Sequence, residues 1–72
     1  MKVKGIEIPQ AAIDAVNAYI GRNDGFTLDE IARVIRDTGW EFGASYDAAE
    51  RLLRAMRKAG RITFQGKKWW RV

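Results

Sequence analysis

The sequence predicts an α+β domain in which three helices precede a C-terminal β-hairpin, with a short strand or arm at the N-terminus. Apolar residues recur at helical spacing in three segments, and capping and turn residues separate those segments. Near the C-terminus, apolar residues alternate with polar ones on both sides of a glycine. The chain has 72 residues and no segment that reads as a linker, so we expect one domain over residues 1–72.

The first helix is expected after an N-terminal segment, residues 2–8, in which apolar and polar residues alternate weakly. Pro9 suits the first position of a helix, where a missing N–H leaves no hydrogen bond unmade. Apolar residues then recur at helical spacing, which predicts a helix over approximately residues 9–20. Gly21 follows and is expected to end this helix in the left-handed conformation.

The second helix begins at the clearest local signal of the chain. Thr27 is an N-cap candidate, and Glu30, three residues later, completes the pattern of a capping box. Phe26 and Ile31 occupy the two positions of a hydrophobic staple, which fixes the angle at which the chain enters a helix. Gly39 is expected to end this second helix.

The third helix follows a connector that carries Trp40 and Phe42, two aromatic residues that we expect to fill the core. Ser45 is predicted to cap the helix, and Gly60 is predicted to close it. One face of this helix holds the apolar residues Ala49, Leu52, Leu53 and Met56, and the opposite face holds Asp47, Arg51, Arg54 and Lys58.

The C-terminal segment predicts a β-hairpin with Gly66 in its turn, and two registers are open. A three-residue loop over residues 66–68 pairs Phe64 with Trp70, whereas a two-residue loop pairs Phe64 with Trp69. We prefer the first register because it uses the apolar alternation better. That register places Trp70 in the core and turns Trp69 to the opposite side.

Charge is distributed unevenly along the chain. The net charge is +4, but residues 1–50 contain five basic and nine acidic residues, for a net charge of −4. Residues 51–72 contain eight basic residues and no acidic residue. Such asymmetry points to a nucleic acid or another anionic partner, and a solvated basic face is the plainer alternative.

Several function classes are disfavoured by what the sequence lacks. It has no Cys and no His, which excludes a disulfide framework, a Cys-ligated zinc site and thiol catalysis, and removes the commonest general base. It has no glycine-rich phosphate loop and no apolar run near the roughly 20 residues that span a bilayer. We therefore expect no enzyme activity, metal, cofactor or membrane partner, and a cytoplasmic location by default.

The order of elements and two segments of the sequence resemble the winged helix-turn-helix family of DNA-binding domains. Residues 27–32 are similar to the start of the second helix of the family. Residues 45–62 are similar to its recognition helix, from the capping Ser to the Gly-x-Ile that opens the hairpin, which is called the wing. The resemblance covers roughly residues 9–72, although the connector over residues 39–44 is longer than the tight turn usual in the family.

The resemblance implies that the chain binds duplex DNA. Residues 46–59 would lie in the major groove as the recognition helix, and residues 61–72 would contact the backbone or the minor groove as the wing. A small regulator of transcription, such as those of phages and mobile elements, is the role that this implies.

Eight residues are candidates for contact with DNA. Arg51 and Arg54 project from the middle of the third helix, and the planar guanidinium group of Arg can pair with guanine or with phosphate. Lys67 and Lys68 stand at the expected hairpin tip, where they would follow a phosphate backbone. The candidates are Tyr46, Glu50, Arg51, Arg54, Lys58, Lys67, Lys68 and Arg71.

Each group of candidates also has a plainer interpretation. Arg51 and Arg54 stand four residues after Asp47 and Glu50, so each can form an ion pair on a solvated helix face. The two acids can accept hydrogen bonds from cytosine amino groups or simply interact with the helix dipole. The lysines of the hairpin can serve solubility alone.

A second functional class is open, because winged helices also serve as protein-interaction modules. Trp40, Phe42 and Trp69 are the candidate anchors of such a surface, since aromatic side chains often dominate the energy of an interface. Self-association is possible as well.

In the DNA-binding interpretation, Arg33 and Arg36 of the second helix are expected to add contacts to the DNA backbone.

Overall fold

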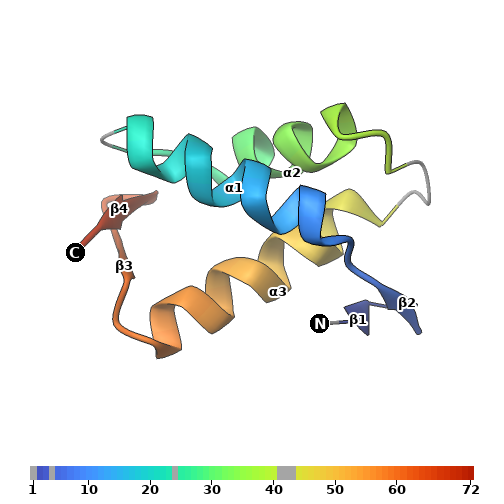
Figure 1. The fold of residues 1–72 in the computed structure, drawn as a ribbon. Coiled ribbons are helices and arrows are strands. Elements are labelled where there is room, and N and C mark those ends of the chain that lie inside the picture. Colours follow the sequence, from blue (N-terminus) through green and yellow to red (C-terminus); the bar gives the residue numbers. More distant parts are fainter. Residues whose placement is uncertain (1, 4, 24, 41–43) are drawn as a thin grey trace.

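The structure is a computed structural model that describes residues 2–3, 5–23, 25–40 and 44–72. Two short strands, β1 (Lys2–Val3) and β2 (Ile6–Glu7), precede the helices α1 (Gln10–Arg22), α2 (Leu28–Asp37) and α3 (Ser45–Lys58). The strands β3 (Ile62–Gln65) and β4 (Lys68–Arg71) follow them (Figure 1). Within these described ranges, three helices followed by an antiparallel hairpin form an α+β arrangement that is consistent with a winged helix.

The N-terminal segment forms a hairpin of its own. Strands β1 and β2 pair antiparallel, and β1 lies near α3 (Figure 1). The chain then passes through Ile8, which is buried in the core, before Pro9 begins the first helix. The expected strand or arm is therefore a two-stranded hairpin beside the helical body.

Helix α1 runs past the end that the sequence predicted. Pro9 stands at the N-cap, and its carbonyl oxygen accepts hydrogen bonds from the amides of Ala12 and Ile13. The expected termination at Gly21 is wrong, because Gly21 and Arg22 are both helical. Asn23 ends the helix instead: its side-chain amide donates to the carbonyl oxygen of Tyr19 at 2.7 Å, which satisfies a helix-terminal carbonyl without a left-handed residue.

The start of α2 confirms the predicted cap. The Thr27 hydroxyl oxygen accepts from the Glu30 amide at 3.3 Å, and the staple residues Phe26 and Ile31 are both fully buried. The Glu30 carboxylate does not complete the box, because it accepts the hydroxyl of Tyr19 on α1 at 2.7 Å. Gly39 follows the last turn as expected.

The start of α3 differs from the prediction by one residue. Ala44 occupies the N-cap position, and Ser45 is the first helical residue. The expected Ser45 cap is therefore wrong. Both residues are buried, and the Ala44 carbonyl oxygen accepts from the Ala48 amide at 2.9 Å, so packing against the core positions this helix start.

The end of α3 turns the chain directly into the C-terminal hairpin. The amide of Gly60 donates to the carbonyl of Arg57, and the amide of Arg61 donates to the carbonyl of Met56, both at 3.0 Å. This pair of bonds is the Schellman arrangement, which requires a residue with positive φ. Gly60 supplies it at 77°, as the sequence predicted.

The core lies between the three helices and under the hairpin. Trp40 is buried as expected, whereas Phe42 lies outside the described residues. The helices contribute the following residues to the core: Ala12, Val16 and Ile20 from α1, Ile31, Ala32 and Ile35 from α2, and Ala48, Ala49, Leu52, Leu53 and Met56 from α3.

None of the helices in the described part of the chain has the length and apolar character to cross a membrane.

The C-terminal hairpin adopts the shorter of the two registers. Phe64 pairs with Trp69 and Gln65 with Lys68, so the preferred three-residue loop is wrong and the turn contains only Gly66 and Lys67. Both turn residues have positive φ, 61° and 69°. A turn of this kind matches the right-handed twist of the flanking strands, whereas a type I or type II turn splays them apart.

The register exchanges the expected roles of the two tryptophans. Trp69 packs partly buried against the core, and its backbone pairs with Phe26. Trp70 is 38% exposed, so its expected place in the core is wrong. The physical reason is the bridge to Phe26, because residues that pair directly across a sheet point to the same face and Phe26 is fully buried.

Candidate nucleic-acid interface

The outer face of α3 presents three of the predicted residues to solvent. Arg51, Arg54 and Lys58 are all exposed, on the side opposite the buried stripe that includes Leu52 and Leu53. The helical period sets this division, because burial of the apolar stripe turns the intervening basic residues outward. The exposed face is therefore a consequence of how α3 packs.

The predicted ion pair between Glu50 and Arg54 is present. The Arg54 guanidinium donates to the Glu50 carboxylate across one turn of α3. Both side chains are well exposed, at 74% for Arg54 and 46% for Glu50, so the pair adds only about 0–1 kcal/mol of stability. Its main effect is to restrict the orientation of the guanidinium, whose remaining N–H groups can donate to another acceptor.

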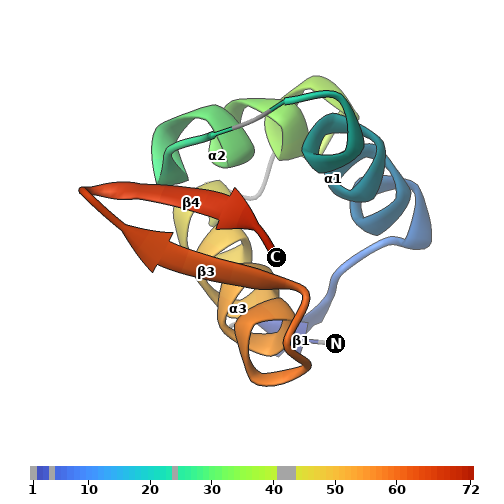
Figure 2. The same cartoon turned by 90° about the vertical axis from the view of Figure 1, so that its left-hand side faces the viewer.

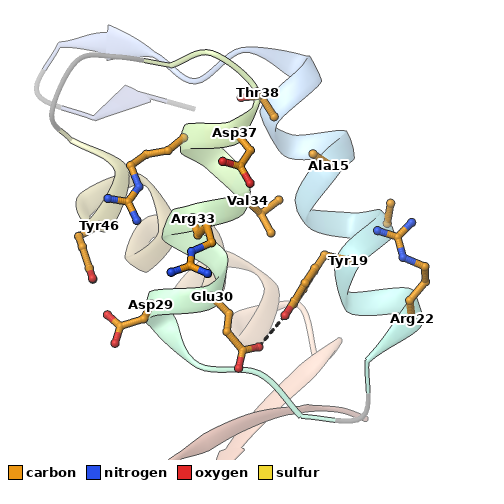
Figure 3. A pocket seen from close by; sticks show the side chains of 12 residues that line it. Ala15, Tyr19, Arg22, Asp29, Glu30, Arg33, Val34, Asp37, Thr38 and Tyr46 are labelled. Atoms are coloured by element: carbon orange, nitrogen blue, oxygen red, sulfur yellow. Dashed lines mark hydrogen bonds between the residues drawn. The ribbon is translucent and has the colours of Figure 1, made fainter.

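Tyr46 connects the start of α3 to α2. Its side chain is 47% exposed, and interaction of its hydroxyl with the nearby Asp29 carboxylate raises the pKa of Tyr46 above its usual value. The positive charges of Arg36 and Arg33 act on this pKa in the opposite direction. Figure 3 shows Tyr46 and Asp29 together on the side of α2 that faces away from α1.

This contact joins α2 to the surface of α3. Arg33 and Arg36 are exposed and lie near the first turn of α3, so the structure brings them beside the predicted site. Sequence reasoning listed both arginines as additional contacts but missed Asp29 as the partner of Tyr46. Periodicity could not have found that partner, because the pair connects two helices.

Lys67 and Lys68 occupy the turn end of the C-terminal hairpin, and both are exposed. Figure 2 shows this turn projecting beyond α2 and α3, on the side of the molecule away from α1. Tyr46 lies away from α1 as well (Figure 3). Along α3 the two are separated, because Figure 1 shows the hairpin beside the C-terminal end of α3 and the start of α3 at the opposite end of the molecule.

Arg71 is separated from the other candidates. Its guanidinium donates to the carbonyl oxygen of Gly21 on α1 at 3.2 Å. Arg61, at the other strand of the hairpin base, donates to the side-chain oxygen of Asn17 on α1 at 3.1 Å. These two arginines anchor the base of the hairpin on α1. Arg71 therefore positions the hairpin, and it lies at the end of β4 that is away from the turn.

A hollow of about 790 Å³ lies between α1 and α2 (Figure 3). The hydrogen bond from Tyr19 to Glu30 spans it and raises the pKa of Tyr19. The charges on its walls balance, because Arg22, Arg33 and Arg36 stand among Asp29, Glu30 and Asp37. Within the described ranges, no group of three or more acidic residues is placed to hold a metal ion.

Of the three aromatic residues that were candidate anchors for a protein partner, the structure describes Trp40 and Trp69, and neither is fully exposed. Trp40 is 6% exposed, which agrees with its expected place in the core and is wrong for the alternative role of a surface anchor. Trp69 is partly buried, and Phe42 lies outside the described residues. The exposed aromatic residues of the hairpin are instead Phe64 and Trp70.

Chemically, the side of the molecule away from α1 can pair with an extended anion. Planar guanidinium groups offer bidentate hydrogen bonds to phosphates or bases, and the two lysines add mobile point charges at the hairpin turn. The exposed basic residues of α2, α3 and the turn are Arg33, Arg36, Arg51, Arg54, Arg57, Lys58, Lys67 and Lys68. None of the protein-family models, curated proteins or solved structures compared with this chain matches it.

Proposed function

We propose that this protein binds duplex DNA, with α3 in the major groove and the hairpin turn on the phosphate backbone or the adjacent minor groove. The observation that carries the proposal is the exposed basic face of α3, formed by Arg51, Arg54 and Lys58. The major groove, about 12 Å wide, admits one α-helix. Arginines at the middle of such a helix can reach guanine edges and phosphates.

The hairpin supports the same mode of binding. Lys67 and Lys68 stand at a tight turn that projects beyond the helices on the side away from α1 (Figure 2). A turn held there by the Phe26–Trp69 bridge can contact backbone phosphates flanking the site of α3. Arg33 and Arg36 on α2 can add contacts at the opposite end of α3.

The size of the molecule limits how much DNA one copy can read. Its longest dimension is 29 Å, which is shorter than the roughly 34 Å of one turn of B-DNA. One copy therefore contacts a short site, and high specificity requires a second copy or a larger host protein. A small regulator of transcription is the role that we propose.

The test is a titration of fluorescently labelled random-sequence duplex DNA at two salt concentrations, followed by selection of preferred sequences. We expect binding whose logarithmic salt slope is about −0.9 for each phosphate neutralised. Absence of binding at low salt would overturn the proposal. Concentration-dependent self-association without DNA binding would favour a protein-interaction role instead.

A further inference from the structure

Three aromatic residues form a row across the small sheet at the hairpin. Phe26 pairs with Trp69, and Trp69 pairs with Phe64, so the three side chains share one face. The rings of Phe64 and Trp69 lie 5.0 Å apart between centroids, in a tilted arrangement. Burial decreases along the row: Phe26 is fully buried, Trp69 is partly buried, and Phe64 is 48% exposed.

Phe64 lies between the buried base of the hairpin and its basic turn. Ile62, two residues earlier on the same face of β3, is buried in the core, so this face of the strand points toward the helical body. Phe64 extends beyond that contact, toward the turn that carries Lys67. Its exposed ring therefore stands beside the side of the molecule that we assign to DNA.

The other exposed aromatic of the hairpin is explained by the fold. Trp70 points to the opposite face, and its indole N–H donates to the Gln65 carbonyl oxygen at 2.9 Å. A Cβ atom placed on Gly25 would lie 3.0 Å from the ring of Trp70, so the ring packs closely on that turn. Nothing comparable covers the exposed half of Phe64 in the described part of the chain.

We propose that Phe64, supported by Trp69, packs on the deoxyribose rings of the DNA strand whose phosphates contact the hairpin turn. This inference rests on the proposed function. A DNA strand alternates anionic phosphates with apolar sugar faces, and a ring about 7 Å along β3 from the turn matches the sugars that flank a phosphate held by Lys67.

The experiment compares the DNA affinity and salt slope of Phe64→Ala with those of the unchanged chain. We expect affinity to fall by about three- to tenfold, because an apolar contact is lost. The salt slope is expected to stay the same, because no charge is removed. Phe64→Leu should retain most of the affinity, since an aliphatic side chain also packs on a sugar.

Two matched variants keep the test independent of folding. Val72→Ala removes an apolar side chain that is 83% exposed at the hairpin base and should leave affinity unchanged. Phe64→Gln retains a side chain of similar length without the ring, and should bind as weakly as Phe64→Ala while melting near the temperature of the unchanged chain.

The outcomes separate this inference from the function on which it rests. If Phe64→Ala binds like the unchanged chain while an Arg51→Ala, Arg54→Ala double variant binds weakly, the sugar contact is wrong and DNA binding stands. If Phe64→Tyr retains affinity and Phe64→Leu loses it, the ring stacks on a base, and the sugar contact is again overturned. If the unchanged chain binds no DNA, the proposed function itself fails.

Discussion

Phe26 and Trp69 are joined by two backbone hydrogen bonds, from the Phe26 amide to the Trp69 carbonyl at 3.0 Å and from the Trp69 amide to the Phe26 carbonyl at 2.8 Å. This bridge connects the segment before α2 to the C-terminal hairpin, across more than half of the sequence. It holds β4 against the helical body and turns the Trp69 side chain toward the core. The position of the basic turn therefore depends on a contact that neither segment could make alone.

The first prediction tests this assignment of the two tryptophans. Trp69→Ala should lower the free energy of unfolding by about 2–3 kcal/mol, because a large, partly buried aromatic side chain is removed. Trp70→Ala should lower it by about 1 kcal/mol, because that ring is more exposed. Urea unfolding monitored by circular dichroism measures both values. A larger loss for Trp70→Ala would indicate the alternative three-residue loop.

Local sequence signals predicted a helix boundary correctly where the capping residue itself takes part in the terminal hydrogen bonds. Thr27 and Gly60 act through hydrogen bonds within three to five residues, so the sequence pattern was sufficient for them. Gly21 and Ser45 failed as predicted boundaries for different reasons. At Gly21 the side chain of Asn23 satisfies the helix end, and at Ser45 burial against the core sets the start.

The candidate nucleic-acid interface could be predicted from the sequence to a similar extent. The exposed positions of Arg51, Arg54 and Lys58 follow from helical periodicity alone. The contact between Tyr46 and Asp29 does not, because it depends on how α2 and α3 pack. The hairpin register was equally non-local, since it is coupled to a partner residue in the segment before α2.

The second prediction concerns the turn. Lys67 has a φ of 69°, a conformation that disfavours a residue with a Cβ atom by roughly 1 kcal/mol. Lys67→Gly should therefore raise the free energy of unfolding by up to about 1 kcal/mol. The same change should weaken DNA binding and reduce the magnitude of the salt slope by about 0.9, because one cation is lost. Thermal melting and salt-dependent anisotropy measure the two effects, and Lys67→Asn provides a neutral control that tolerates positive φ.

The third prediction addresses the link between α1 and α2. Tyr19→Phe removes the hydroxyl that donates to Glu30 and should lower the free energy of unfolding by about 1 kcal/mol at pH 7. Because the hydrogen bond to Glu30 raises the pKa of Tyr19 in the folded chain, its contribution is complete below the usual tyrosine pKa and is lost as pH rises through the raised value. The stability difference between the two proteins should therefore shrink in strong alkali. A difference that grows with pH would contradict this assignment.

The fourth prediction concerns the ion pair on α3. Glu50→Gln should change the free energy of unfolding by less than about 0.5 kcal/mol, because the Glu50–Arg54 pair is well exposed. Removal of a negative charge next to the bound DNA should strengthen binding to random sequences several-fold at low salt. Asp14→Asn is a control that removes an exposed negative charge from α1 rather than from α3. Equal gains from both variants would show a general charge effect rather than a local one.

The fifth prediction separates recognition of the base sequence from non-specific electrostatic binding to DNA. If Arg51 and Arg54 read base edges, replacing both with Ala should remove the preference for the selected sequence over random DNA, while residual binding through α2 and the hairpin turn persists. Each bidentate contact between Arg and guanine contributes about 1–3 kcal/mol of discrimination, so the loss should be at least tenfold in the ratio of the two affinities.

The matched control for this double variant is Arg22→Ala, an exposed arginine that Figure 3 shows on the far side of α2 from Tyr46. Its binding should change little, and its preference for the selected sequence should be unaffected. Competition titrations with selected and random duplexes give both ratios directly. If the double variant weakens binding to both duplexes equally, the two arginines contact only phosphates, and any sequence preference has to come from the remaining contacts or from the shape of the DNA.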